Sequence, residues 1–503
     1  MFEGYPRYMS NVEHWVDGAD FIGESTRTAP VYNPATGAAQ RQVRLATTGD
    51  VGVAVASAKK AFPEWSNASW SKRSQVMFAF RELLNARKDE VAAILTNEHG
   101  KVTSDALGEI ARGLEVVEYA TGMPHLAKGE YSENVSTGVD VYSIKQALGV
   151  VGIISPFNFP AMVPLWFFPI AIAAGNTVVL KPSEKDPSAA IWMAQLMKEA
   201  GLPDGVLNVV HGDKESVDAI LEHPDVASVS FVGSTPIAKY IYETAARHGK
   251  RVQALGGAKN HMLVLPDADL DLVADSAVNA GFGSAGERCM AISVVVAVEP
   301  VADELIAKVK ERMVTLTVGD GTRGCDMGPL ITREHRDKVA SYIDVAIDDG
   351  ADVVVDGRGI RVDGEADGFW LGPTLIDKVS PDSDVYKHEI FGPVLSIVRV
   401  TSYEEGVALI NASEFGNGTA IFTNDGGAAR RFQHEVTVGM VGINVPIPVP
   451  VGYYSFGGWK NSLFGDAKAY GPQAIAFFTR EKTMTSRWLD PSHGGINLGF
   501  PQN

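Results

Sequence analysis

The sequence predicts an α/β protein whose main part is a doubly wound parallel sheet. Between Gly149 and Leu265, short β-branched runs alternate with helical patterns, which is typical of βαβ units with helices on both faces of a sheet. Further along, the runs "SVVVAV", "ADVVVDG" and "LSIVRV" recur with helical segments between them, which predicts a second α/β unit. The length of 503 residues agrees with two to four domains.

The remaining elements follow from local patterns. Apolar residues recur at helical spacing over 74–101 and 105–122, so we expect the N-terminal third to be rich in helix. Segments 133–149 and 474–488 are strand-like and detached from the rest, so they could add to sheets of other subunits. The most apolar stretch, 159–175, contains three prolines and is shorter than the roughly 20 apolar residues of a membrane span. It predicts a buried helix.

Composition excludes several kinds of partner. The net charge is −17, the pI is about 5.1, and no stripe of Lys and Arg interrupts the acidic balance, so we expect no nucleic-acid and no membrane partner. The two cysteines, Cys289 and Cys325, cannot build a disulfide framework and have no metal-ligand spacing. We therefore expect no metal site and a reducing, cytoplasmic location. The first residues predict neither a secretory signal nor a transit peptide, and Met9 is an alternative start.

Two strand-to-helix turns are candidates for binding a nucleotide. In "FVGSTPIA", 231–238, the helix N-terminus near Ser234 offers unpaired N–H groups to a phosphate. The alternative is an ordinary capped turn with Pro236 at the first helical position, and the three-glycine fingerprint is absent. In "LKPSEKDPS", 180–188, Lys181 and Glu184 follow a strand. An acidic side chain there accepts ribose hydroxyls and repels a 2′-phosphate, which favours NAD over NADP; solvated loop charges are the alternative.

Two further motifs carry candidate catalytic groups. In "SPFNFP", 155–160, Asn158 is held between two aromatic residues, and a rigid amide is a good donor to an oxyanion. Asn158 could instead simply complete a turn. In "GSAGERCMAIS", 283–293, Cys289 stands beside Arg288 before an apolar strand or helix, and a neighbouring cation favours the nucleophilic thiolate. Cys325 is expected to pack inertly.

Taken together and in this order, "SPFNFP", "LKPSE", "FVGST", "LGG", "GERCMA", "EIFGPV" and "GINVPIPVPVGYYSFGGWKNSLFGD" resemble the aldehyde dehydrogenase superfamily over essentially the whole chain. Within it, "GAKNH", "RCMA", "NVPIPVP" and "TREKTMTSRW" resemble the CoA-acylating branch that acts on methylmalonate and malonate semialdehyde. The resemblance implies a Rossmann-type NAD-binding domain (1–123 and 147–255) and an α/β catalytic domain (256–457). It also implies a small oligomerisation β-arm (124–146 and 470–503) and commonly a homotetramer.

The resemblance assigns the central chemistry to two residues. Cys289 would attack the aldehyde, and the Asn158 amide with a backbone N–H near Cys289 would hold the oxyanion of the thiohemiacetal. Transfer of hydride to NAD⁺ then leaves a thioester on Cys289.

Position 254 distinguishes two fates of that thioester. In hydrolytic members of the family the "LGG" turn is preceded by Glu, a general base that activates water, whereas here Ala254 has no proton acceptor. The resemblance therefore implies coenzyme A as the co-substrate that accepts the acyl group. The alternative is that Gln253 or Glu389 does the work of the missing base.

A substrate carboxylate needs a cationic partner, best a planar guanidinium. Arg288 adjoins the nucleophile, and Arg112 matches the position of the second carboxylate-binding arginine in this branch. A β-carboxy thioester can lose CO₂ through a stabilised enolate, so decarboxylation to acetyl-CoA or propanoyl-CoA is implied. From the sequence alone, Arg112 could equally be an exposed helical arginine.

The resemblance also implies a set of cofactor contacts: Ser155, Phe157, Lys181, Glu184, Lys185, Ser234, Gly256, Glu389 and Phe391. Within the set, Ser155 and Phe157 would lie beside the nicotinamide half, Ser234 at the pyrophosphate and Glu389 at the nicotinamide ribose. Lys181, Glu184 and Lys185 would surround the adenosine ribose.

The chain departs from the family pattern in three places. Lys185 stands where Arg is usual, Glu287 where Gln is usual, and "LGG" replaces a Met-Gly version of the turn. Glu287 adds an anion near Cys289, which we expect to raise the pKa of the thiol or weaken the carboxylate site.

Two rival functions remain at this stage. The first is a hydrolytic aldehyde dehydrogenase that yields the free acid, and Ala254 speaks against it. The second is a non-catalytic dinucleotide-binding protein, and the joint presence of Asn158, Cys289 and Glu389 speaks against that.

Overall fold

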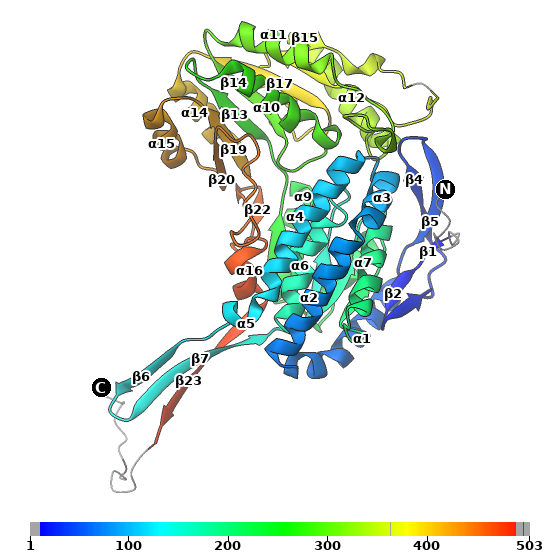
Figure 1. Ribbon diagram of the computed structural model, residues 1–503, viewed down its shortest axis with the longest axis vertical. Helices are drawn as coiled ribbons and strands as arrows, with labels where there is room; N and C mark the ends of the chain where they lie inside the picture. The colour runs from blue at the N-terminus through cyan, green and yellow to red at the C-terminus, as the bar shows by residue number, and fades with distance from the viewer. Residues whose placement is uncertain (1–10, 363, 489–495, 497–503) are drawn as a thin grey trace.

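The computed structural model describes residues 11–362, 364–488 and 496, and its largest sheet has eight strands (Figure 1). In spatial order these are β22 (Leu463–Phe464), β12 (Arg251–Leu255), β11 (Val226–Val232), β8 (Val150–Ile154), β9 (Thr177–Lys181), β10 (Leu207–Val209), β2 (His14–Val16) and β3 (Ala19–Phe21). The five strands from β12 to β10 are parallel. From β8 the chain winds through β9 and β10 to one side, and through β11 and β12 to the other. The predicted doubly wound sheet is confirmed.

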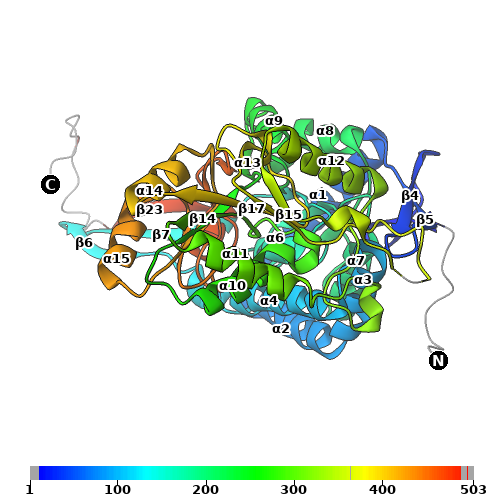
Figure 2. The same ribbon diagram turned by 90° about the horizontal axis from the view of Figure 1, so that it is seen from above.

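Helices cover both faces of this sheet (Figure 2). One face carries α1 (Thr48–Asn67), α8 (Lys214–Glu222) and α9 (Thr235–Arg247). The other carries α6 (Met162–Ala173) and α7 (Ser188–Glu199), with α2 (Trp70–Ala86), α3 (Lys88–His99), α4 (Thr103–Thr121) and α5 (Met123–Leu126) packed around them. All residues of α6 are buried, as the apolar run predicts. Within the described residues no helix is both long and apolar enough to span a membrane.

A second sheet carries the later α/β unit (Figure 1, top). Its order is β15 (Asp352–Val355), β16 (Thr374–Asp377), β17 (Val394–Val400), β14 (Ile292–Val298), β13 (Asn260–Val264), β19 (Gly418–Phe422) and β20 (Met440–Ile443). Only β15 runs antiparallel to its neighbour. Its helices are α10 (Leu270–Phe282), α11 (Ala302–Met313), α12 (Arg333–Asp348), α13 (Asp384–Lys387), α14 (Tyr403–Ala412) and α15 (Gly426–Glu435). The last run of the first rhythm, 261–265, belongs to this sheet as β13 rather than to the first.

A three-stranded arm projects from the body (Figure 1, lower left). It consists of β6 (Tyr131–Ser136), β7 (Val139–Ala147) and β23 (Thr479–Arg487), all antiparallel. The expectation of strand over 474–488 is wrong for its first part, because α16 (Gly471–Phe477) occupies it. Pro472 starts this helix, and its buried apolar side chains pack against α6. Most of the predicted arm beyond 488 lies outside the described residues.

The prediction of a helix-rich N-terminal third is incomplete, because strands precede the helices. Besides β2 and β3, a small sheet is formed by β1 (Asn11–Val12), β5 (Ala38–Arg44) and β4 (Thr28–Asn33). A two-stranded ribbon of β18 (Phe415–Gly416) and β21 (Trp459–Lys460) completes the strand inventory of the described chain. Residues 1–10, with the alternative start Met9, are outside the described part. The domain boundaries given above stay a prediction.

Candidate active site

The point where the strand order reverses, between β8 and β11, carries several unsatisfied polar groups. In open α/β sheets, ligands bind outside the carboxyl ends of the strands at such a point. Ser155 follows β8, and within the described residues its buried hydroxyl has no hydrogen-bond partner. Ser234 follows β11 as the N-cap of α9 and makes no side-chain cap, so the first N–H groups of α9 remain open. A Cβ at Gly256 would lie 2.6 Å from the Asn461 carbonyl oxygen, so this turn is closely packed. The open donors fit a phosphate-bearing ligand.

The residues after β9 lie beside this point. The ammonium of buried Lys181 is 3.3 Å from Glu184 Oε2, and the Glu184 side chain keeps 35% of its surface exposed. The Lys185 ammonium lies 4.7 Å from the centroid of the Phe157 ring. Phe157 in turn meets Phe391 edge to face, with centroids 5.8 Å apart. The structure thus brings the predicted contacts of the adenosine side and the nicotinamide side onto one continuous surface.

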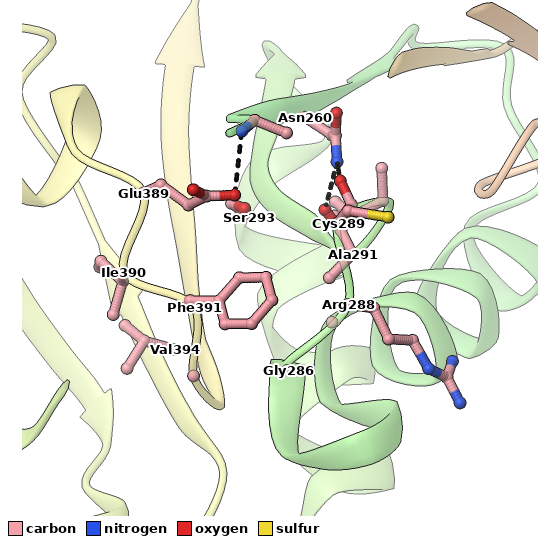
Figure 3. Close-up of a pocket in the computed structure, with 14 residues that line it drawn as sticks. Asn260, Gly286, Arg288, Cys289, Ala291, Ser293, Glu389, Ile390, Phe391 and Val394 are labelled. Atoms are coloured by element: carbon pink, nitrogen blue, oxygen red, sulfur yellow. Dashed lines mark hydrogen bonds between the residues drawn. The ribbon is translucent and has the colours of Figure 1, made fainter. Parts of the chain in front are cut away.

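Cys289 lines a pocket in the second α/β unit (Figure 3). The pocket is formed mainly by the two segments that lead into β14 and β17, and these segments carry the motifs around Cys289 and Glu389. Cys289 follows a 3₁₀ turn, η1 (Gly283–Gly286), and precedes β14, so the open question of strand or helix after the cysteine is answered as strand. The lining residues include three further predicted site residues: Arg288, Glu389 and Phe391. Cys289 keeps part of its surface exposed.

Two asparagine amides fix the backbone of the cysteine. Asn260 Nδ2 donates to the carbonyl oxygens of Cys289 and Ala291, both at 2.9 Å (Figure 3). Asn417 Nδ2 donates to the Cys289 carbonyl at 3.1 Å. The neighbouring Lys259 donates to the carbonyl of His388, directly before Glu389. The "GAKNH" motif therefore holds two walls of the pocket.

The Cys289 thiol is not activated in this state. Burial, followed by the nearby Glu389 carboxylate, raises the pKa of Cys289 to about 12. Arg288 favours the thiolate, as expected, but burial and the Glu389 carboxylate outweigh its effect on the pKa. The Arg288 guanidinium pairs with Asp105 on α4 and extends away from the sulfur in Figure 3. A positive charge brought next to the sulfur would lower its pKa again.

Glu389 is the second titratable group of the pocket. Its Oε1 accepts a hydrogen bond from the Ala258 N–H at 2.9 Å, and a Cβ at Gly257 would come within 2.3 Å of Oε2. Burial raises the pKa of Glu389 to about 7, so it exchanges a proton near neutrality. Glu389 is thus able to act as a base as well as a hydrogen-bond acceptor.

Glu287 points away from the pocket, contrary to our expectation of an anion beside the thiol. Its side chain is fully buried, and Oε1 accepts the Ile331 N–H at 3.2 Å. His99 and His335 flank it, each with Nε2 3.6 Å from a carboxyl oxygen. Burial raises the pKa of Glu287 to about 8, and burial lowers the pKa of His335 to about 4. At neutral pH the cluster is therefore mainly uncharged.

The buried proton on Glu287 predicts a pH-dependent stability. Because folding raises its pKa from 4.5 to about 8, this proton stabilises the native chain fully below pH 4.5, and the contribution is lost as pH rises to about 8. Glu287→Gln lacks this titration, so we expect its melting temperature to gain on that of the native chain between pH 5 and 8. The underlying slope is at most about 1.4 kcal/mol per pH unit. Scanning calorimetry of both proteins measures it, and a pH-independent difference would contradict the shifted pKa.

Arg112 lies on α4 and is joined to the irregular 444–450 segment that follows β20. Its guanidinium makes two hydrogen bonds to Glu115, at 2.8 and 2.9 Å, and donates to the Pro450 carbonyl at 2.7 Å. The Tyr470 hydroxyl donates to the same carbonyl at 2.9 Å, and Tyr470 belongs to the apolar cluster against which Cys289 packs. Tyr470 and Arg112 therefore hold the same carbonyl of this segment. Sequence reasoning missed Tyr470, because only the fold brings it there.

The other predicted residues are all buried. Asn158 is buried in the loop between β8 and α6, and its neighbour Phe159 packs on the same apolar cluster as Cys289. The Ala254 methyl is fully buried in β12 and supplies no acceptor. Gln253 Nε2 donates to Ser230 Oγ at 2.7 Å inside the sheet, while its buried Oε1 has no hydrogen-bond partner among the described residues. A neutral amide is not basic near neutral pH, so Gln253 is unsuited to act as a general base.

Within the described residues, no group of three or more His, Cys, Asp or Glu side chains is arranged to hold a metal ion. The Cys325 thiol donates to the carbonyls of Gly319 and Asp320, at 3.1 and 3.2 Å, and burial raises its pKa. These contacts agree with inert packing of Cys325.

Known proteins resemble this chain along nearly its whole length. The sequence model of the aldehyde dehydrogenase family matches residues 21–484. Malonate-semialdehyde dehydrogenase of Pseudomonas aeruginosa is 53% identical over 98% of this chain and all of its own length; that of Geobacillus thermodenitrificans is 47% identical over 95% and 99%.

Solved structures agree with this result. The crystal structure of methylmalonate-semialdehyde dehydrogenase from Oceanimonas doudoroffii has a TM-score of 0.95 and 55% identity, covering 96% of this chain and 99% of that one. A candidate methylmalonate-semialdehyde dehydrogenase from Sinorhizobium meliloti, complexed with NAD, has a TM-score of 0.95 and 52% identity with the same coverage.

Proposed function

Because the chain belongs to the aldehyde dehydrogenase family, we propose that it oxidises malonate or methylmalonate semialdehyde and transfers the acyl group to coenzyme A. The main support is the combination of two observations. The nucleophilic Cys289 lines a pocket, and the buried methyl of Ala254 stands where hydrolytic relatives have their general base. The names of the most similar relatives support the substrate class. The deciding experiment measures NADH formation from malonate semialdehyde with and without CoA, together with the acyl products and CO₂.

The residues at the carboxyl ends of β8, β9 and β11 fit NAD⁺, which supplies the hydride acceptor when bound. The open N–H groups of α9 near Ser234 suit a pyrophosphate, and the unpartnered Ser155 hydroxyl offers a further polar contact. Glu184, partly exposed beside Lys181, suits a ribose diol and disfavours a 2′-phosphate. We assign the other contacts to Phe157, Lys185, Gly256, Glu389 and Phe391.

The chemistry of the acyl group runs through Cys289. Its sulfur forms a bond to the aldehyde carbon, the thiol proton passes to solvent, and the Asn158 amide holds the resulting oxyanion. With NAD⁺ bound, that carbon would give up a hydride to the cofactor as the C=O bond re-forms, which oxidises the aldehyde by two electrons and leaves a thioester. The thiol of CoA then attacks the thioester carbon, and Cys289 departs as the leaving thiolate. Without a base at Ala254, water competes poorly for the same carbon.

The substrate carboxylate would be recognised by Arg112 and Arg288. Each guanidinium is presently held by a carboxylate of α4, Glu115 or Asp105, so a substrate anion would share or replace these partners. The bound acyl group is then a β-carboxy thioester. When its C–CO₂ bond breaks, the electron pair enters the thioester enolate, which takes up a proton to give the acetyl or propanoyl product.

The role of Arg112 can be tested by the choice of substrate. We expect Arg112→Gln to raise KM for malonate semialdehyde about 10- to 100-fold, because one charge-assisted interaction contributes roughly 1.5–3 kcal/mol. Propanal, which has no carboxylate, should be oxidised with nearly unchanged KM. Steady-state kinetics with both aldehydes measures the difference. An equal loss for both substrates would assign Arg112 to holding the 444–450 segment instead.

A second candidate function, hydrolysis to the free acid, is favoured by one observation. The Glu389 carboxyl borders the Cys289 pocket and has a pKa of about 7, so it could activate water in place of the missing base. Sustained CoA-independent turnover that is lost in Glu389→Gln would establish this function.

We further propose that the arm mediates oligomerisation into a homotetramer. Large apolar side chains are exposed on its strands, with Tyr131 64% and Tyr142 39% exposed, and Ile144 adds to them on β7. Exposed apolar surface on an extended strand ribbon is typical of a subunit interface.

A further inference from the structure

We propose that Lys101 and Glu109 are positioning residues that fix the Asn158 amide for oxyanion binding. They form a buried ion pair whose remaining hydrogen bonds all go to the backbone around Asn158. The inference rests on the proposed function, since it needs Asn158 to hold the oxyanion. Neither residue belongs to the motifs that predict the active site.

Lys101 holds the carbonyl of the residue that it positions. It follows α3 in the loop before α4, and its side chain is 1% exposed. The ammonium donates to Glu109 Oε2 at 2.5 Å and to the Asn158 carbonyl oxygen at 2.7 Å. It also lies 4.5 Å from the centroid of the Phe159 ring, a favourable cation–π distance. The ammonium is thus shared between its counter-ion and the loop.

Glu109 holds the same loop three and four residues after Asn158. Its Oε1 accepts the N–H groups of Ala161 and Met162, at 2.8 and 3.0 Å, where α6 begins. A carboxylate at a helix N-terminus is favourable because it meets unpaired N–H groups and the positive end of the helix dipole. The pair therefore ties three backbone groups of 158–162 to α4 and to the loop before it.

This arrangement fits a positioning role because the Asn158 side chain has no hydrogen bond of its own to any described residue. Its amide is free to meet a substrate oxygen, so its place is set by the backbone and by packing. Oxyanion donors act only when they are held within a few tenths of an ångström of the productive geometry. Buried charges are costly, and a pair whose hydrogen bonds are all satisfied specifies a single arrangement of the groups it contacts.

The test is a double-mutant cycle between Lys101→Met and Asn158→Ala. The readout is the single-turnover rate of NADH formation from malonate semialdehyde, with NAD⁺ affinity and melting temperature measured alongside. We expect N158A to slow this step about 10²- to 10³-fold, as for loss of an oxyanion donor. K101M should slow it about 10-fold or more in the native background, because a displacement of about 1 Å costs up to 10²-fold. In the N158A background, K101M should change it less than about 2-fold.

Lys250→Met is the matched control. Lys250 is a buried lysine that donates to the carbonyls of His223 and Val226, at the amino ends of β11 and β12, whereas Asn158 follows the carboxyl end of β8. The Lys250→Met variant should have a lower melting temperature than the native protein but the same rate of hydride transfer. If K101M fails to fold, the double variant K101M/E109L replaces the pair by apolar side chains, a change that folded proteins often tolerate. It should keep a near-native melting temperature and still show the slow step.

The outcomes separate the two hypotheses. If N158A forms NADH at the native rate, the oxyanion role of Asn158 in the proposed function is wrong, and the positioning role falls with it. If N158A is slow but K101M is either fast or equally harmful in both backgrounds, the proposed function stands and the positioning role is wrong. The positioning role is supported if K101M slows NADH formation in the native background but not in the N158A background.

Discussion

Without coenzyme A, the protein should form about one NADH per chain from malonate semialdehyde and then nearly stop. The burst reflects oxidation to the Cys289 thioester, and the stall reflects the absence of a base at Ala254, whose methyl is fully buried in β12. General-base catalysis typically contributes about 10²- to 10⁴-fold, so CoA should accelerate steady turnover by a factor of that order. Stopped-flow absorbance of NADH, followed by analysis of acyl-CoA and CO₂, measures both phases.

The control for this experiment is Glu389→Gln. Any residual CoA-free turnover that disappears in this variant would come from the Glu389 carboxyl, whose pKa of about 7 lets it accept a proton. A native protein that turns over continuously to the free acid, with no response to CoA, would show that the acyl-transfer assignment is wrong.

Cys289→Ala should reduce NADH formation by about 10⁴-fold or more, because no covalent intermediate can then form. Binding of NAD⁺, followed by fluorescence or calorimetry, should persist, since Cys289 is not one of the proposed cofactor contacts and most of them lie after β8, β9 and β11. Cys325→Ala is the matched control: among the described residues the Cys325 thiol donates hydrogen bonds to the carbonyls of Gly319 and Asp320 alone, so its loss should leave the rate unchanged. Substantial activity in Cys289→Ala would overturn the covalent mechanism.

The sequence predicts the central architecture well because it depends on local patterns. The β-branched runs that became β8, β9, β11 and β12 are separated by helices, and a buried parallel strand needs little more than such a run. The strands β1, β2 and β3 were missed because they have only two or three residues each, and β4 and β5 because they are largely exposed or half-buried. The helix α16 was mistaken for a strand because an apolar run of a few residues has no distinguishing period.

The site was predictable only where a motif carries it. Short motifs predict Cys289 and Glu389, and the structure brings both into one pocket. The partners of the other site residues come from distant segments: Asp105 pairs with Arg288, and Tyr470 and Arg112 both donate to the Pro450 carbonyl. No local pattern indicates such pairings. The expectation that Glu287 lies beside the Cys289 thiol was likewise wrong. Its side chain points inward between two histidines, because neighbours in sequence can face opposite ways.

The antiparallel pairing of β22 with β12 has a consequence for synthesis of the chain. Leu463 and Phe464 cover the edge of a sheet whose other central strands end by Leu255, so about 200 residues must be translated before that edge is closed. An uncovered β12 would present open backbone groups to other nascent chains on the same messenger. Closing so long a loop is slow. We therefore expect the ribosome-bound intermediate with a bare β12 edge to be a stage of biogenesis at which the chain needs protection from aggregation.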